Sequence, residues 1–157
     1  MSVLCDCRKV AARDWHNREL VFENRSFYVH RLPLFFHLPI CLSRRIKKLK
    51  SEVAMKNYSI ADPLMVIQKD GSLSGMVMLE IDPPRFFDPK IKTFDKNLFF
   101  SWISEEAPIN LREELSEAKR IVQTNGQKIK DVYFWYTTCP KCKTINGNQT
   151  VILLQIS

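Results

Sequence analysis

Two cysteines near the C-terminal end of the sequence have a spacing that metal sites and redox sites share. Cys139 and Cys142 are separated by two residues, and two thiolates at this spacing can bind the same zinc ion. A closed structural zinc site needs four ligands, and Cys5 and Cys7 form the obvious second pair. The sequence therefore makes zinc a candidate cofactor, held by Cys139 and Cys142 and completed by Cys5 and Cys7 if the two segments meet.

The same Cys-x-x-Cys segment fits two other roles. Thiol–disulfide exchange uses such a pair when the first thiol is activated at the N-terminus of a helix. Only fifteen residues follow Cys142, which is too short a segment for the helix and sheet that a thioredoxin fold places after its active site. The remaining interpretation is structural, with the cysteines shaping a turn between two strands. All three interpretations stay open.

Charge and hydrophobicity narrow the environment of the chain. The 157 residues carry a formal net charge of +7, which favours an anionic partner or serves solubility. Seven of the first twenty residues are charged, so we expect no secretory signal. The apolar run at residues 32–42 is interrupted by two prolines and is too short to span a membrane. We therefore expect a cytoplasmic protein with reduced thiols and no membrane partner.

Hydrophobic periodicity predicts two amphipathic helices. In the first, apolar side chains recur at positions that share one helical face: Leu42, Ile46, Leu49 and Val53. Adding 69 to each of these numbers gives the apolar face of the second: Leu111, Leu115, Ala118 and Val122. The equal spacing indicates an internal repeat.

The first predicted helix also carries a basic face. Clustered cations gain affinity for nucleic-acid phosphates by displacing counterions, and the cations here are Arg44, Arg45, Lys47 and Lys48. A solvated helix face is the simpler explanation of the same pattern. Nucleic acid is therefore an alternative partner rather than the first choice.

Runs of β-prone residues surround each predicted helix. Two short runs, at residues 19–22 and 26–32, predict a hairpin before the first helix. Asp70-Gly71, between two further apolar runs, predicts a second hairpin after it. Similar runs flank the second helix, so each half of the chain is expected to contain strand, helix and hairpin in that order.

These elements predict a single α+β domain over residues 1–157. In this prediction a duplicated β-α-β-β unit forms an antiparallel sheet with two amphipathic helices on one face, and a groove lies where the two halves meet. The expected parts are an N-terminal segment and two halves: residues 1–18, 19–82 and 95–157.

This order of elements resembles that of the GyrI-like superfamily of small-molecule-binding proteins. The resemblance covers residues 26–157 and rests on the element order and on the Asp70-Gly71-Ser72 hairpin followed by Gly-Met-Val-Met-Leu-Glu at 75–80. It implies an aromatic-lined cleft between the halves, often with a buried acidic residue, that holds small organic or cationic amphipathic ligands. The residues that would form such a cleft here are Tyr133, Trp135, Phe99, Trp102, Glu80 and Glu105.

The first hypothesis for the function is therefore small-molecule binding, in a groove between two repeats with the Cys-x-x-Cys loop beside it. Some members of the superfamily resemble hydrolases. No acidic residue of this sequence can be matched to theirs, so the sequence does not decide whether the protein is an enzyme. The second hypothesis is a zinc-stabilised module that binds nucleic acid or protein through its basic helix, and the third is a thiol–disulfide enzyme.

Overall fold

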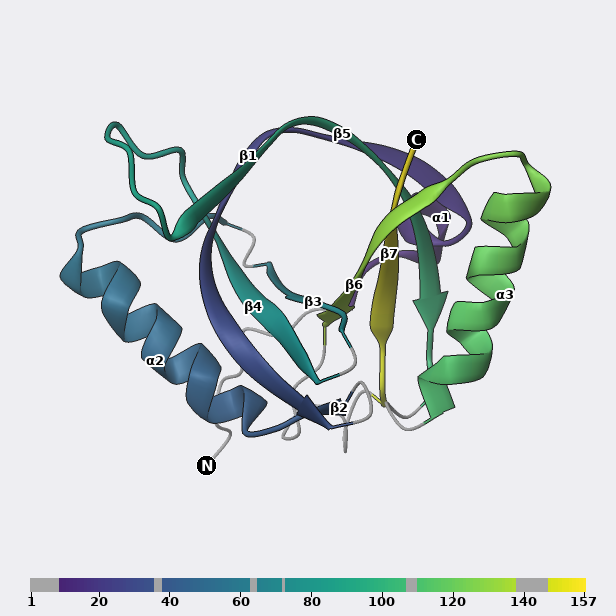
Figure 1. Cartoon of the computed structure of the whole chain (residues 1–157), viewed down its shortest axis with the longest axis horizontal. Coiled ribbons are helices and arrows are strands. Elements are labelled where there is room, and N and C mark those ends of the chain that lie inside the picture. Colours follow the sequence, from purple (N-terminus) through teal and green to yellow (C-terminus); the bar gives the residue numbers. More distant parts are fainter. Residues whose placement is uncertain (1–8, 36–37, 63–64, 72, 107–109, 138–146) are drawn as a thin grey trace. The chain divides into compact units, whose positions relative to one another are not determined.

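The computed structural model describes residues 9–35, 38–62, 65–71, 73–106, 110–137 and 147–157. The described chain forms two compact units, which we name after their long helices (Figure 1). The α2 unit is Val21–Leu98, and the α3 unit consists of the described residues up to Leu20 and from Phe99 onward. None of the described helices is long and apolar enough to cross a membrane.

The α2 unit is built on a long first strand. Strand β1 (Arg18–Phe35) pairs antiparallel with β4 (Ser74–Ile81), which in turn pairs antiparallel with β3 (Val66–Lys69). The short β2 (Leu38–Pro39) pairs with the end of β1. The predicted hairpin at residues 19–22 and 26–32 is wrong, because the chain continues as one strand. The turn-forming residue Asn24 takes a positive φ of 51° within that strand instead of reversing it.

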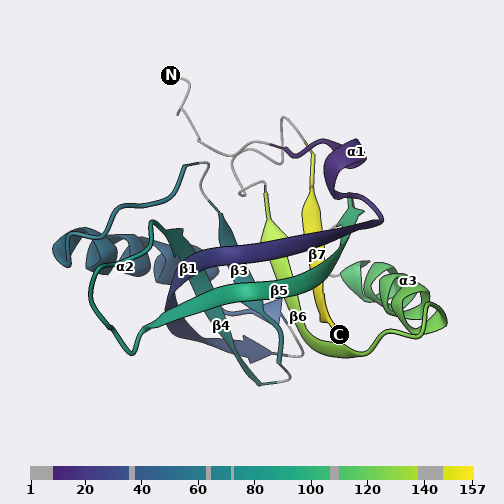
Figure 2. The same ribbon diagram turned by 90° about the horizontal axis from the view of Figure 1, so that it is seen from above.

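Strand β1 has a second neighbour in this unit. Strand β5 (Ile91–Ser104) begins beside it, where the N–H of Val29 donates to the carbonyl oxygen of Lys90 at 2.9 Å (Figure 2). The hydroxyls of Ser26 and Thr93 meet at 3.0 Å further along the same pair of strands. One edge of β1 therefore bonds to β4 and the other to the start of β5.

Helix α2 (Leu42–Met55) covers the sheet of its unit through its apolar face. Leu49 and Val53 are fully buried, and they pack in one cluster with side chains from β1 and β4: Tyr28, Leu32, Leu34, Val77, Leu79 and Ile81. The predicted hairpin after the helix is confirmed between β3 and β4. Glycine is required there, because a Cβ at Gly71 would lie 2.0 Å from the carbonyl oxygen of Ser74.

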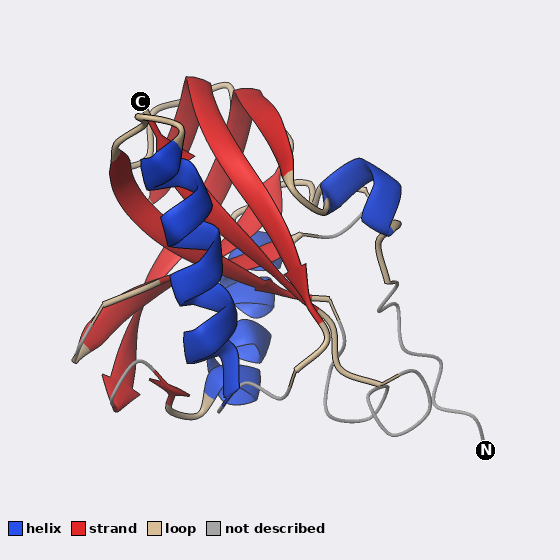
Figure 3. Cartoon of the chain, turned by 90° about the vertical axis from the view of Figure 1, so that its right-hand side faces the viewer, coloured by secondary structure: helices blue, strands red, loops and turns tan. Residues whose placement is uncertain are grey.

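The α3 unit contains the second part of β5, helix α3 (Leu111–Thr124), β6 (Ile129–Tyr136) and β7 (Thr150–Ile156), preceded by the short α1 (Ala12–Trp15). Strands β6 and β7 pair antiparallel, and β7 also bonds to β5. Helix α3 packs against β6 and β7 (Figure 3). Every residue of β7 is buried, so this strand is the core of the unit.

The internal repeat is visible in the two units. Each contains strand, helix, strand and strand in that order, and the strand orders correspond, with β1-β4-β3 in one unit and β5-β7-β6 in the other. Both helices have 14 residues, and adding 69 to the termini of α2 gives the termini of α3. The two predicted amphipathic helices are therefore confirmed. Their placement on one face of a shared sheet stays a prediction.

The two helices also end in the same way. Asn57 and Gly126, again 69 positions apart, both take a positive φ, of 59° and 77°. The N–H of the following residue then bonds back into the helix, from Tyr58 to Val53 and from Gln127 to Val122. This left-handed C-terminal conformation provides hydrogen bonds to carbonyl groups in the last turn of each helix.

Candidate ligand-binding pocket

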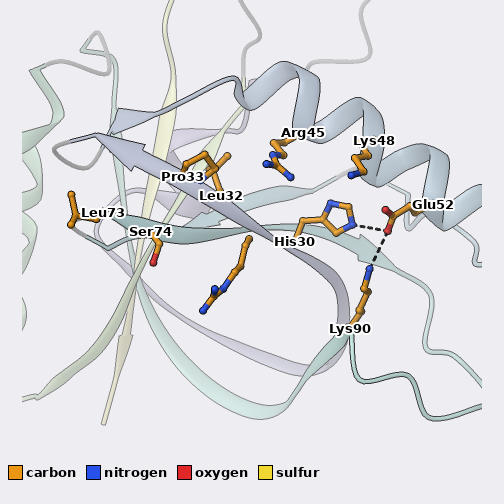
Figure 4. Close-up of a pocket in the computed structure, with 10 residues that line it drawn as sticks. His30, Leu32, Pro33, Arg45, Lys48, Glu52, Leu73, Ser74 and Lys90 are labelled. Atoms are coloured by element: carbon orange, nitrogen blue, oxygen red, sulfur yellow. Dashed lines mark hydrogen bonds and ion pairs between the residues drawn. The ribbon is translucent and has the colours of Figure 1, made fainter.

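A pocket of about 430 Å³ lies in the α2 unit, open to solvent, between α2 and the second half of β1 (Figure 4). Strand β1, helix α2, the hairpin before β4 and the start of β5 all contribute to its lining. Its exposed apolar surface comes from Pro33 and Leu73, whereas Leu32, which also lines it, is fully buried. Its cations are Arg31, Arg45, Lys48 and Lys90, and its single carboxylate is Glu52.

His30 and Glu52 form the central polar contact of the pocket. Nε2 of His30 lies 2.6 Å from Oε2 of Glu52. The same oxygen accepts a hydrogen bond from the Tyr28 hydroxyl at 3.1 Å and lies 3.6 Å from Nζ of Lys90. The hydrogen bond with His30 is the main cause that holds the pKa of Glu52 below its ordinary value of 4.5, while burial acts in the opposite direction. Glu52 is therefore charged, and its Oε2 atom already contacts three polar side chains.

Lys90 is positioned by the carboxylate of Asp88. Oδ1 of Asp88 accepts the backbone N–H of Lys90 at 2.9 Å, and Oδ2 accepts the Tyr58 hydroxyl at 2.7 Å and Nζ of Lys56 at 3.0 Å. These hydrogen bonds, first among them the one from Lys90, lower the pKa of Asp88 to about 2. The loop between β4 and β5 is thus tied to the end of α2, beside the pocket.

The four predicted nucleic-acid-binding cations fall into two pairs. Arg45 and Lys48 line the pocket, and Figure 4 shows both side chains directed from α2 toward the strand that carries His30. Arg44 and Lys47 are exposed and do not line it. Residues three or four apart share a helix face, which places Arg45 and Lys48 together with Glu52.

The predicted aromatic ligand residues lie in the α3 unit, and two of them are core residues. Phe99 and Tyr133 are fully buried, with ring centres 5.9 Å apart, and burial raises the pKa of the Tyr133 hydroxyl. Trp102 and Trp135 are partly exposed. Nε1 of Trp102 donates to Glu114 at 2.7 Å.

The two predicted acidic residues lie in different units. Glu80, in the α2 unit, is buried and receives two hydrogen bonds from Arg25, at 2.5 and 2.8 Å. Glu105 is exposed just after β5 in the α3 unit. None of the six predicted residues lines the α2 pocket. Their role in a groove between the halves stays a prediction.

The cysteine predictions fall outside the described residues. Cys5, Cys7, Cys139 and Cys142 all lie in the segments that are not described, so zinc binding and redox chemistry there stay predictions. Within the described ranges, no group of three or more histidine, cysteine or acidic side chains is placed to hold a metal ion. Cys41 is exposed and has a free thiol.

Sequence reasoning missed the residues at the centre of the pocket. His30 gave no signal, because it stands alone within a strand. Glu52 gave a weak one, since it is the one acidic residue of α2 and follows Lys48 by four positions. Lys90 and Asp88 gave none, because a loop sequence does not reveal which helix the loop will meet.

Comparison with solved structures finds the same fold in the C-terminal domain of EcmrR. The crystal structure of the EcmrR C-terminal domain has a TM-score of 0.65 at 14% identity, with 91% of this chain and 98% of that chain covered. EcmrR in a cryo-EM complex with DNA has a TM-score of 0.69 at 13% identity, with 89% of this chain covered. The protein spans only 56% of that longer EcmrR chain.

A hydrolase from Listeria innocua is also similar, with a TM-score of 0.52 at 10% identity and coverage of 91% of this chain and 93% of that one. The chain belongs to the family described as bacterial hydrolase, whose model matches residues 2–156. The family is thus a hydrolase family by name rather than the GyrI-like one that the sequence resembles. A comparison with curated proteins found no match.

Proposed function

We propose that the protein binds a small organic molecule in the pocket between α2 and β1. The observation that carries this proposal is the composition of the pocket, in which the exposed apolar side chains of Pro33 and Leu73 adjoin convergent polar groups. Small-molecule sites in proteins combine these two kinds of surface, and their volumes begin at about 300 Å³. The resemblance of the element order to the GyrI-like small-molecule-binding superfamily supports the same function.

The test is a screen of the whole chain against a library of small organic molecules, read by melting temperature and by NMR shifts of backbone amides. Ser74→Trp places a large side chain in the pocket lining, where Ser74 is exposed, and is expected to abolish binding. Ser116→Trp, at an exposed position of α3, is the matched control and is expected to leave binding intact. A ligand that binds both variants equally would place the site elsewhere.

A second candidate function is hydrolysis of the bound molecule, which the family match and the contact of His30 with Glu52 favour. A carboxylate that holds one nitrogen of an imidazole leaves the other nitrogen to accept a proton. In this scheme the free nitrogen of His30 takes a proton from water while the water oxygen attacks the acyl carbon of the substrate. Glu52 stabilises the imidazolium that forms, which then returns its proton to the leaving alcohol or amine as the bond between that group and the acyl carbon breaks.

Hydrolysis is tested with a panel of simple esters and amides under excess substrate. Wild-type protein is expected to turn over at least one of them, and His30→Gln to lose that turnover while still binding the product. Glu52→Gln should retain part of the rate, because His30 keeps a hydrogen-bond partner. Wild-type rates equal to buffer rates across the panel would leave ligand binding as the function of the pocket.

A further inference from the structure

We propose that the pocket between α2 and β1 selects an organic anion, with a carboxylate or phosphate group bound by the side chains of Arg45 and Lys48 and by the backbone N–H of Arg31. This inference rests on the proposed binding function and specifies its ligand class. Four of the side chains that line the pocket are Lys or Arg, against a single carboxylate. A hollow lined by one sign of charge concentrates ions of the opposite sign.

The single carboxylate does not neutralise the cations that remain. Glu52 is engaged by His30, Tyr28 and Lys90, at 2.6, 3.1 and 3.6 Å. In the part of the chain that the structure describes, no carboxylate lies within ion-pair distance of the other three cations: Arg31, Arg45 and Lys48. The charges of these three cations are therefore not balanced by the carboxylate of the pocket.

Helix geometry brings two of these cations, Arg45 and Lys48, to one place. Arg45 and Lys48 are three positions apart on α2 and point into the same hollow (Figure 4). A guanidinium offers a planar pair of donors that fits the two oxygens of a carboxylate or phosphate, and the ammonium adds a point charge. The two groups together form a clamp for one anionic group.

The edge of β1 supplies a backbone donor to the same hollow. The N–H of Val29 points to the edge at which Lys90 lies, and alternate residues of a strand direct their N–H groups to the same edge. Arg31 therefore directs its N–H to this edge, and it also lines the pocket. Bonds from backbone N–H groups to an oxyanion are among the stronger hydrogen bonds of proteins.

The apolar side chains that line the pocket determine what the uncharged part of the ligand must be. Leu73 is 74% exposed, so its side chain has surface to contribute to a bound molecule. Together with the exposed Pro33 it forms the wall that an aromatic or aliphatic body would cover. The ligand class is thus a small organic acid, in contrast to the cationic amphipathic ligands that the GyrI-like resemblance implies.

The first experiment compares four probes of similar size on the full chain: benzoate, phenyl phosphate, neutral benzamide and cationic benzylamine. Dissociation constants come from NMR titration of the amide signals of Arg31, Leu73 and Lys90. We expect both anions to bind roughly tenfold or more tightly than benzamide, because their hydrogen bonds are charge-assisted. We expect no shifts with benzylamine. Equal affinity for benzoate and benzamide would overturn the inference.

The second experiment uses two double variants of α2 that remove the same charge. Arg45→Gln with Lys48→Gln is expected to weaken benzoate binding by roughly tenfold or more. The matched control, Arg44→Gln with Lys47→Gln, neutralises exposed cations that do not line the pocket and should change affinity by less than about twofold. Equal losses in both variants would show that net charge rather than the pocket holds the anion.

Binding to duplex DNA tests whether the cations of α2 recognise the phosphates of nucleic acid rather than a small organic anion. If α2 serves nucleic acid, both double variants should weaken duplex retention equally, with a salt dependence set by the phosphates contacted. That result, without benzoate binding, would overturn the inference. If the wild-type protein binds neutral library molecules, Ser74→Trp abolishes that binding, and neither benzoate nor phenyl phosphate binds, the proposed function stands and this inference is refuted. A chain that binds neither class would refute both.

Discussion

Nε2 of His30 in β1 lies 2.6 Å from Oε2 of Glu52 in α2, and this contact joins strand to helix at the floor of the pocket. The two residues are 22 positions apart in sequence. Glu52 therefore has two effects that oppose each other. Its bond to His30 stabilises the packing of α2 on β1, whereas its negative charge repels any anion that enters the pocket.

Glu52→Gln should therefore change stability and anion affinity in opposite directions. We expect the free energy of unfolding at pH 7 to fall by about 1 kcal/mol, since the charge-assisted bond becomes a neutral one, and benzoate to bind more tightly. Because the native state lowers the pKa of Glu52, the contribution of its carboxylate to stability is present above pH 4.5 and is lost as the pH falls below 4.5. Urea unfolding from pH 7 to pH 3 measures the convergence of variant and wild type.

The control for this change is Glu23→Gln, at an exposed position of the same unit. Its stability should follow the wild type at every pH. A gap between Glu52→Gln and the wild type that stays constant down to pH 3 would contradict the assigned role of the carboxylate.

Asp88→Asn should produce a second pH-dependent loss, in a more acidic window. The hydrogen bonds from Lys90, Tyr58 and Lys56 lower the pKa of Asp88 from 3.8 to about 2. Its contribution to stability is then complete above pH 3.8 and disappears as the pH falls toward 2. Thermal unfolding of wild type and variant between pH 5 and pH 2 should show two curves that meet at the acidic end. Asp95→Asn, at an exposed position of β5, should show no such window.

Arg25→Met should be more destabilising than Glu80→Gln. The Glu80 side chain is only 10% exposed, whereas that of Arg25 is 29% exposed. Removing the arginine leaves a buried carboxylate without its cation, at a cost of about 3 kcal/mol, whereas the arginine left by Glu80→Gln can turn toward water. Denaturant unfolding gives both values. Arg25→Met also removes the contact of the guanidinium with the Phe22 ring, whose centre lies 4.3 Å from the Arg25 Cζ atom. A larger loss of stability in Glu80→Gln than in Arg25→Met would therefore contradict this explanation.

Gly126→Ala should destabilise the end of α3 by about 1 kcal/mol, because a β-carbon disfavours the positive φ of 77° at this position. The cost is one of backbone conformation alone, since a Cβ at Gly126 meets nothing within 4 Å. Gly126→Asn should cost less, as asparagine tolerates this conformation and stands at the equivalent position of α2, Asn57. Equal losses for the alanine and asparagine variants in thermal unfolding would argue against this explanation.

The local elements of this protein can be predicted from its amino-acid pattern. Both 14-residue helices and their spacing of 69 follow from apolar residues at helical intervals, and the β3–β4 hairpin follows from Asp70-Gly71. These features depend on residues within a few positions of one another, so a pattern along the chain is sufficient to predict them. The continuity of β1 through Asn24 was missed, because a bulge and a turn use the same residue types.

Which side chains meet depends on how the elements pack. Alternation along β6 places Tyr133 and Trp135 on one face, but it does not reveal that Tyr133 is fully buried against Phe99. Glu80 became the partner of Arg25, 55 positions away, and His30, Glu52 and Lys90 came together from a strand, a helix and a loop. Such contacts depend on how elements pack over long sequence separations, and periodicity within one element carries no information about its neighbour.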